Sequence, residues 1–130
     1  MKRIVYLFPV VLLSVFTSIS FGSGDVLDNV ADAIRSGNAS SVAVFFDTNI
    51  DLTILEQEGN YSHAQAEIVL KDFFQKNPVR SFKLVHRGSS GSDAQFGIGT
   101  LQSSSSLRVY YLLKPHNGKM LIQTLSFEQQ

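Results

Sequence analysis

Three histidines are the side chains of this sequence best suited to acid–base chemistry or to metal binding. They are His63, His86 and His116. An imidazole titrates near neutral pH and is a common metal ligand. No two of the three have the H-x-x-x-H or H-x-x-E spacing that presents ligands on one helix face, and the sequence contains no cysteine. The sequence therefore predicts no metal site and no cofactor.

His86 is the histidine with the strongest claim to a functional role. It alternates with Phe82 and Leu84 along one face of an expected strand, so we expect its ring to point inward. A hydrogen-bonded core histidine and a ligand-contacting histidine are both consistent with that position. His63 lies at the start of an expected helix and His116 beside an expected turn, so both should be exposed.

Paired carboxylates are a second arrangement that can support acid–base catalysis, because close pairs shift each other's pKa. Asp47 with Asp51, and Glu56 with Glu58, are such pairs. Both are expected at strand ends or in a loop, where carboxylates are normally solvated. No serine lies in a G-x-S-x-G motif, and no glycine-rich phosphate-binding loop is present. These observations argue against most kinds of enzyme.

Aromatic residues are abundant, with ten Phe and four Tyr. At inward positions they either fill a core or border a partly open apolar pocket, which is the usual form of a small-molecule site. For a pocket, the expected lining residues are Phe46, Phe74, His86, Phe96 and Tyr111.

The first residues follow the order of a secretory signal peptide. Lys2 and Arg3 precede an apolar run over 4–16 and a polar stretch over 17–20. Small residues favour cleavage after Gly22, which leaves residues 23–130 as a single domain with no membrane span. We expect export to the periplasm or beyond. An uncleaved anchor is the alternative, and the polar residues 17–20 disfavour it.

Charge is balanced, with eleven Lys and Arg against eleven Asp and Glu. The basic residues outside the signal are scattered, whereas nucleic-acid binding needs them clustered. We therefore expect no nucleic-acid partner.

Hydrophobic spacing predicts the element order α-α-β-α-β-β-β-β. A polar loop containing Gly59-Asn60 precedes the third helix, which Ser62 and Gln65 begin with a capping box. Asn117-Gly118 predicts a type I′ turn, and broken alternation predicts a bulge near Gln123-Thr124. The expected helices span 25–36, 39–46 and 62–77, and the expected strands span 49–55, 79–88, 94–102, 107–114 and 120–128. Early helices and a late meander indicate an α+β fold.

With these residues, the sequence resembles the nuclear transport factor 2-like (cystatin-like) superfamily, and within it a family of small uncharacterised exported bacterial proteins. The resemblance covers nearly all of residues 23–130. It implies a cone-shaped α+β fold, with helices packed on one face of a curved, mostly antiparallel sheet. The residues that carry it are Gly59-Asn60-Tyr61-Ser62 with Gln65-Ala66, Asp72-Phe73-Phe74, Phe82-Lys83-Leu84-Val85-His86, Phe96-Gly97-Ile98-Gly99-Thr100-Leu101, Arg108-Val109-Tyr110 and Ile122-Gln123.

The resemblance leaves the activity open, because this fold carries isomerases, dehydratases and binding modules. No Asp or Glu is expected on an inward strand face, so we favour a non-catalytic binding or interaction module. Its partner would be a small apolar molecule in the cone, or an envelope protein on the sheet face that carries Arg108 and Tyr110. That face is also suited to a homodimer. The alternative is a small cofactor-independent isomerase or lyase that uses His86.

Overall fold

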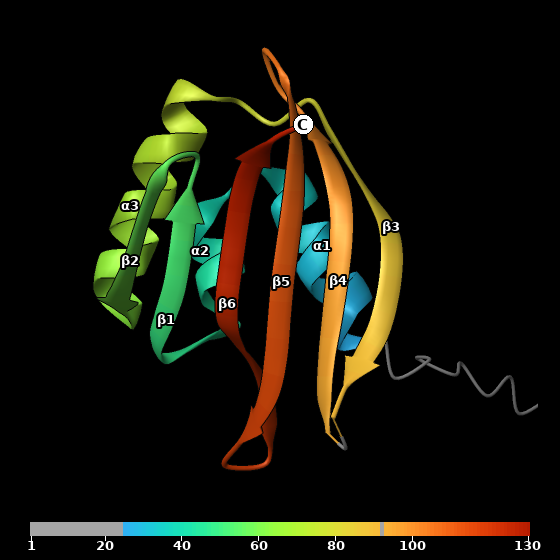
Figure 1. Cartoon of the computed structure of the whole chain (residues 1–130). Helices are drawn as coiled ribbons and strands as arrows, with labels where there is room; N and C mark the ends of the chain where they lie inside the picture. The colour runs from blue at the N-terminus through green and yellow to red at the C-terminus, as the bar shows by residue number, and fades with distance from the viewer. Residues whose placement is uncertain (1–24, 92) are drawn as a thin grey trace, which may run out of the picture.

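A computed structural model describes residues 25–91 and 93–130 of the chain (Figure 1). The predicted export signal, residues 1–22, lies outside the described residues. No described helix is long and apolar enough to cross a membrane. The helices are α1 (Val26–Ser36), α2 (Ala39–Ala43) and α3 (His63–Lys76), and the strands are β1 (Phe46–Ile54), β2 (Gln57–Ser62), β3 (Ser81–Ser90), β4 (Ala94–Gln102), β5 (Ser106–His116) and β6 (Lys119–Gln129).

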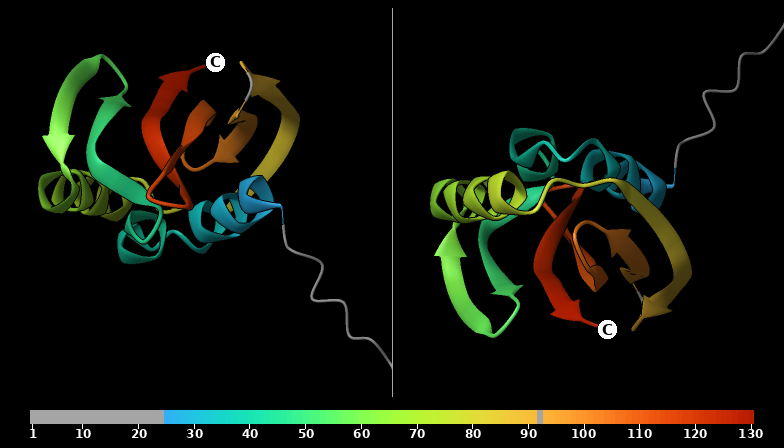
Figure 2. Two further views of the ribbon diagram at one scale, coloured as in Figure 1. Left: turned by 90° about the horizontal axis from the view of Figure 1, so that it is seen from below. Right: turned by 90° about the horizontal axis from the view of Figure 1, so that it is seen from above.

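The six strands form one sheet in the order β2-β1-β6-β5-β4-β3. Strands β3 to β6 are the predicted antiparallel meander, whereas β1 pairs with β6 in parallel. The three helices form a layer on one face of the sheet, and the described residues leave the opposite face without a helix (Figure 2). We call this opposite face the uncovered face. The predicted α+β class and the curved sheet are confirmed.

One segment that the sequence predicts to be a loop is a strand in the structure. Gly59 and Asn60 belong to β2, which pairs with β1, and the turn between these strands lies earlier, at Leu55 and Glu56. Leu55 has φ 57°, a left-handed conformation that a branched side chain rarely adopts. The Gly59-Asn60 pair is a typical turn signal and the Leu55-Glu56 pair is not, which is why sequence reasoning missed the hairpin.

The helices begin and end where their capping residues satisfy free backbone groups. The Asp25 side chain accepts a hydrogen bond from the Leu27 N–H, and Gly37 ends α1 in the left-handed conformation. The capping box of Ser62 and Gln65 is confirmed at the start of α3. These caps fix where the amphipathic faces of α1 and α3 begin.

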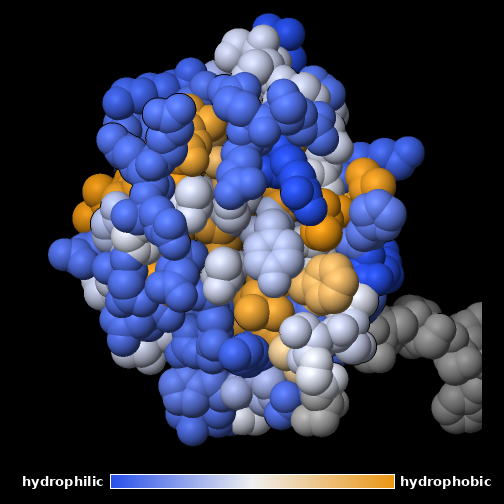
Figure 3. Space-filling model, viewed as in Figure 1, coloured by the Kyte–Doolittle hydropathy of each residue, from blue (hydrophilic) through white to orange (hydrophobic). Residues whose placement is uncertain are grey.

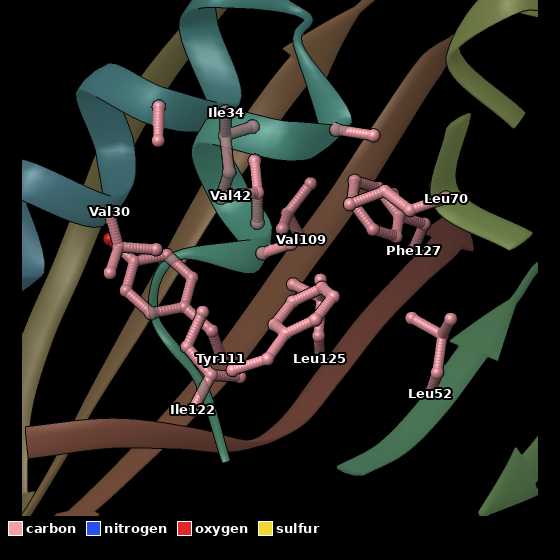
Figure 4. Packing of buried hydrophobic residues seen from close by; sticks show 14 of the residues in the cluster. Val30, Ile34, Val42, Leu52, Leu70, Val109, Tyr111, Ile122, Leu125 and Phe127 are labelled. Atoms are coloured by element: carbon pink, nitrogen blue, oxygen red, sulfur yellow. The ribbon is translucent and has the colours of Figure 1, made fainter. Parts of the chain in front are cut away.

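The core lies between the helix layer and the covered face of the sheet (Figure 4). Residues at alternate positions of β5 and β6 point into it, among them Tyr111, Leu125 and Phe127, all fully buried. The Tyr111 hydroxyl donates a hydrogen bond of 2.8 Å to the Leu27 carbonyl of α1. Burial raises the pKa of this hydroxyl, so it remains a neutral donor that ties the sheet to the helix layer.

Two bulges decide which side chains face the helices. The predicted bulge in β6 is confirmed, because Leu112 pairs with Thr124 and Leu113 with Ile122, which leaves Gln123 as the extra residue. The predicted turn at Asn117-Gly118 is also present, with positive φ at both residues.

The second bulge, in β3, was not predicted. Leu84 pairs with Gly99 and His86 with Ile98, so Val85 is the extra residue. After an extra residue the alternation reverses. His86 therefore points to the uncovered face and is exposed, which corrects the expectation that its ring points inward. Arg87 takes the covered side instead.

The ion pairs of Arg87 with the start of α1 are a physical reason for this bulge. The Arg87 guanidinium contacts the carboxylates of Asp25 at 2.7 Å and Asp28 at 2.6 Å, at the start of α1. The hydrogen bond from Arg87 holds the pKa of the Asp28 carboxyl below its ordinary value. Without the bulge, Arg87 would point away from α1 and these ion pairs could not form.

Candidate functional site

The five residues expected to line one pocket do not lie together. Phe46, Phe74 and Tyr111 are 3%, 5% and 0% exposed and belong to the core. His86 and Phe96 lie on the uncovered face. Five surface grooves of the described residues are each lined by at most one of the five. The aromatic side chains that point toward the helices therefore pack the cone rather than border a shared cavity.

The uncovered face instead carries an apolar strip along β4 and β5. Its members are half-buried and alternate with fully buried core residues on the same strands: Phe96, Ile98, Tyr110 and Leu112. Ile98 pairs with Tyr110 and Phe96 with Leu112 across the strands. The Phe96 and Tyr110 rings stack with centroids 6.3 Å apart and planes at 30°. Such cross-strand contacts stabilise the two strands and fix the rings at the surface.

Gly88 makes room for one of these rings. A Cβ at Gly88 would lie 2.7 Å from the Phe96 ring, so the ring rests directly on the backbone of β3. Figure 3 shows hydrophobic surface over the middle strands of this face, bordered by hydrophilic residues. An apolar strip with a polar border is the usual anatomy of a protein interface.

His86 and Arg108 lie beside this strip. Together they line a hollow of about 310 Å³, with Ile98 on the side of the strip. The other lining residues are Val85, Gly99, Thr100 and Gln130. No Asp or Glu side chain lines the hollow, so the isomerase or lyase alternative finds no acidic side chain as a partner for His86 here. The predicted sheet-face residues Arg108 and Tyr110 both lie on the uncovered face, the first exposed and the second half-buried.

The charges of the uncovered face are divided between its two halves. β3 and β5 present Lys83, His86 and Arg108, whereas β1, β2 and β6 present Asp51, Glu58 and Glu128. The strip lies in the basic half. A surface with opposite charges on its two halves is electrostatically complementary to a second copy of itself.

A histidine–carboxylate pair is the arrangement that sequence reasoning missed. His116 Nδ1 lies 2.6 Å from Asp47 Oδ1, although 69 residues separate them. Parallel pairing places the start of β1 beside the start of β6. His116 lies at the end of β5 and pairs with Lys119 at the start of β6, so the β5–β6 hairpin places it close to Asp47. The one signal in the sequence was Asp47 directly after the apolar pair Phe45-Phe46, where a buried carboxylate needs a partner.

Asp47 is only 7% exposed, and its contacts keep it ionised. Burial by itself would raise the pKa of the carboxyl. Hydrogen bonds from the Thr48 N–H, from His116 and from the Gln123 amide outweigh burial and hold the pKa below its ordinary value. The charged carboxylate therefore fixes the imidazole through Nδ1. Within residues 25–91 and 93–130, no three His, Cys, Asp or Glu side chains form a group able to hold a metal ion.

The order of elements and the sheet are those of the nuclear transport factor 2-like, or cystatin-like, α+β fold. A protein from Nostoc punctiforme with a cystatin-like fold superposes with a TM-score of 0.63 at 11% identity, over 79% of this chain and 72% of that chain. A protein from Xanthomonas campestris, named as a candidate calcium/calmodulin-dependent protein kinase II association domain, superposes with a TM-score of 0.59 at 18% identity, over 81% and 83%.

Residues 27–128 match the model of the domain of unknown function DUF4783, and the chain belongs to this family. The structure of a family member from Bacteroides uniformis superposes with a TM-score of 0.77 at 23% identity, over 82% of this chain and 98% of that chain. No curated protein matches the sequence.

Proposed function

We propose that this protein is an exported, non-catalytic interaction module that pairs with a second copy of itself through the uncovered face. The apolar strip of Phe96, Ile98, Tyr110 and Leu112 is the observation that carries the proposal. Half-buried aromatic and aliphatic side chains on a rigid sheet lose little conformational freedom when a partner covers them.

The size of the face supports a dimer. Six strands about 4.8 Å apart and roughly 30 Å long present roughly 800 Å², which is about what each partner of a standard protein interface buries. The sheet backbone holds this surface in place, so pairing requires little rearrangement.

The charge division supports a second copy over an unrelated partner. In a symmetric dimer with its axis along β5, that strand faces its own copy and β3 faces β1 of the partner. Lys83 and His86 then lie over the acidic side that carries Asp51. The neighbour from Xanthomonas campestris is itself named as an association domain, which supports association as a use of this fold.

Sedimentation equilibrium of the protein without residues 1–22 tests the proposal, because all described elements lie within residues 25–130. We expect a dimer that dissociates at micromolar concentration or below. Tyr110→Lys places an unpaired charge in the middle of the strip and should raise the dissociation constant at least about tenfold, or about 1.4 kcal/mol. Lys83→Glu should also weaken the dimer, because it places a negative charge over the acidic side of the other copy.

Val44→Lys is the matched control, because Val44 is an exposed apolar residue, 72% accessible, outside the sheet face. It should leave the dimer intact. Urea melts establish that each variant is folded. A folded wild-type protein that is monomeric at roughly hundredfold higher concentration, or a dimer that Val44→Lys disrupts and Tyr110→Lys does not, contradicts the proposal.

Export is tested separately, on the full chain expressed in a bacterium. The positive residues Lys2 and Arg3 and the apolar run over 4–16 support it. Intact-mass measurement of the periplasmic fraction should give a protein that begins at Ser23. Leu13→Arg breaks the apolar run and should retain the chain in the cytoplasm. Full-length wild-type protein in the membrane fraction would instead indicate the uncleaved anchor.

A further inference from the structure

A groove of about 430 Å³ opens at the end of the domain where β1 and α3 begin and where the β5–β6 hairpin turns. This is the lower end in Figure 1. The groove shares no residue with the apolar strip or with the His86 hollow. Its lining consists of Phe46, Thr48, His63, His116, Asn117, Lys119 and Leu121.

Three of these side chains are basic and none is acidic. Lys119 offers an ammonium group with three N–H donors, and a protonated His63 or His116 ring donates from both of its nitrogens. Thr48 and Asn117 add neutral hydrogen-bonding groups. A groove with this lining favours an anionic group over a cationic one.

The wall of the groove is apolar. Phe46 is almost fully buried beneath it, and the His63 ring meets the Phe46 ring edge to face, with centroids 5.9 Å apart and planes at 72°. Leu121 is half-buried. A ligand that contacts both this apolar wall and the basic side chains of the groove therefore combines an apolar body with a negative charge.

Asp47 determines how His116 is presented. Its carboxylate, which also binds the Thr48 N–H and the Gln123 amide, accepts a hydrogen bond from His116 Nδ1 at 2.6 Å. The ring orientation is thereby fixed. Nε2 has no hydrogen-bond partner among residues 25–91 and 93–130. The His116 side chain is 44% exposed, so this nitrogen is accessible to a ligand in the groove.

We propose that this groove binds a small organic carboxylate with an aromatic or short aliphatic body. The carboxylate accepts hydrogen bonds from Nε2–H of the protonated His116 ring and from the Lys119 ammonium, and the body packs against Phe46, His63 and Leu121. Asp47 acts as a positioning residue through His116. The site is independent of the dimer proposed above.

The test is a titration of the ¹⁵N-labelled protein without residues 1–22, followed by NMR at about pH 6, because a lower pH increases the protonated fraction of any imidazole. Benzoate is the probe. Benzamidine, a cation of the same shape, and inorganic phosphate, an anion without an apolar body, are the comparison ligands. Benzoate should shift the amides of Thr48, His63 and Leu121 and bind at least about tenfold more tightly than either, a difference of about 1.4 kcal/mol.

Single substitutions test which side chains contact benzoate. His116→Gln and Lys119→Gln alter exposed hairpin residues and should each weaken benzoate at least threefold while the rest of the spectrum is unchanged. His86→Gln, on the uncovered face, is the matched control and should have no effect. Asp47→Asn should weaken benzoate when His116 is present and have no further effect when His116 is already glutamine, because Asp47 acts through His116; a merely structural effect would persist in both backgrounds.

Three results would overturn the proposal. They are equal affinity for benzoate and benzamidine, benzoate shifts that map to another groove, and equal weakening by His86→Gln and His116→Gln. If His116→Gln were to unfold the protein, Lys119→Gln would still decide the outcome, because that side chain extends from the hairpin into solvent.

Discussion

Replacing Phe73 by alanine is expected to lower the free energy of unfolding by about 3–5 kcal/mol. Phe73 lies on the buried face of α3, 4% exposed, and its ring centroid lies 5.0 Å from that of Phe127 and 5.9 Å from that of Phe74. Removal of the ring leaves a cavity where the helix meets the sheet. Since domains of this size are stable by about 5–15 kcal/mol, urea melts should show a large shift of the midpoint.

Ile68→Ala is the control on the same helix. Ile68 is 68% exposed, so its truncation should cost less than about 0.5 kcal/mol. A loss below about 1 kcal/mol for Phe73→Ala, or similar losses for the two variants, would show that α3 packs with a different face toward the sheet.

Gly97→Ala is expected to cost about 3 kcal/mol, although it adds a single methyl group. Gly97 is buried and pairs with Tyr111 across β4 and β5. A Cβ there would lie 2.6 Å from the Tyr111 ring and 2.8 Å from its hydroxyl. The ring is fully buried and can move aside only by breaking its hydrogen bond to the Leu27 carbonyl, so overpacking and a lost buried hydrogen bond add together.

Gly88→Ala separates this effect from the intrinsic cost of changing a strand glycine. A Cβ at Gly88 would also meet a ring, that of Phe96, at 2.7 Å. Phe96 lies on the uncovered face, so in the monomer its ring can turn into solvent at a cost of less than about 1 kcal/mol. Thermal melts of the two variants should differ clearly, and equal losses would contradict the assignment of the Gly97 effect to Tyr111.

The sequence correctly predicts those structural elements that depend on a few neighbouring residues. The capping box of Ser62 and Gln65, the turn at Asn117-Gly118 and the bulge at Gln123 each depend on a few neighbouring residues, and the structure contains all three. The hairpin turn at Leu55-Glu56 has no such signal. Its conformation is imposed by strand pairing and by the hydrogen bond from the Leu55 N–H to the Phe127 carbonyl.

The candidate sites were harder to predict because they depend on register and on long-range pairing. Phe82, Leu84 and His86 alternate so regularly that no bulge was expected, and one extra residue, Val85, moved His86 to the other face. The Asp47–His116 contact depends on the parallel pairing of β1 with β6. Neither strand's own sequence specifies which partner it takes, so no local pattern could place those two side chains together.

The position of β6 has a consequence for how the domain is made. This strand is the last of the domain to be synthesised, yet it lies between β1 and β5 in the middle of the sheet. Until it emerges from the ribosome, the β1–β2 hairpin has no neighbour that joins it to β3–β5, and the helices have no complete surface to cover. Closing contacts between the first and last strands gives a high contact order and slow folding. The sheet therefore cannot be completed until β6 has been synthesised.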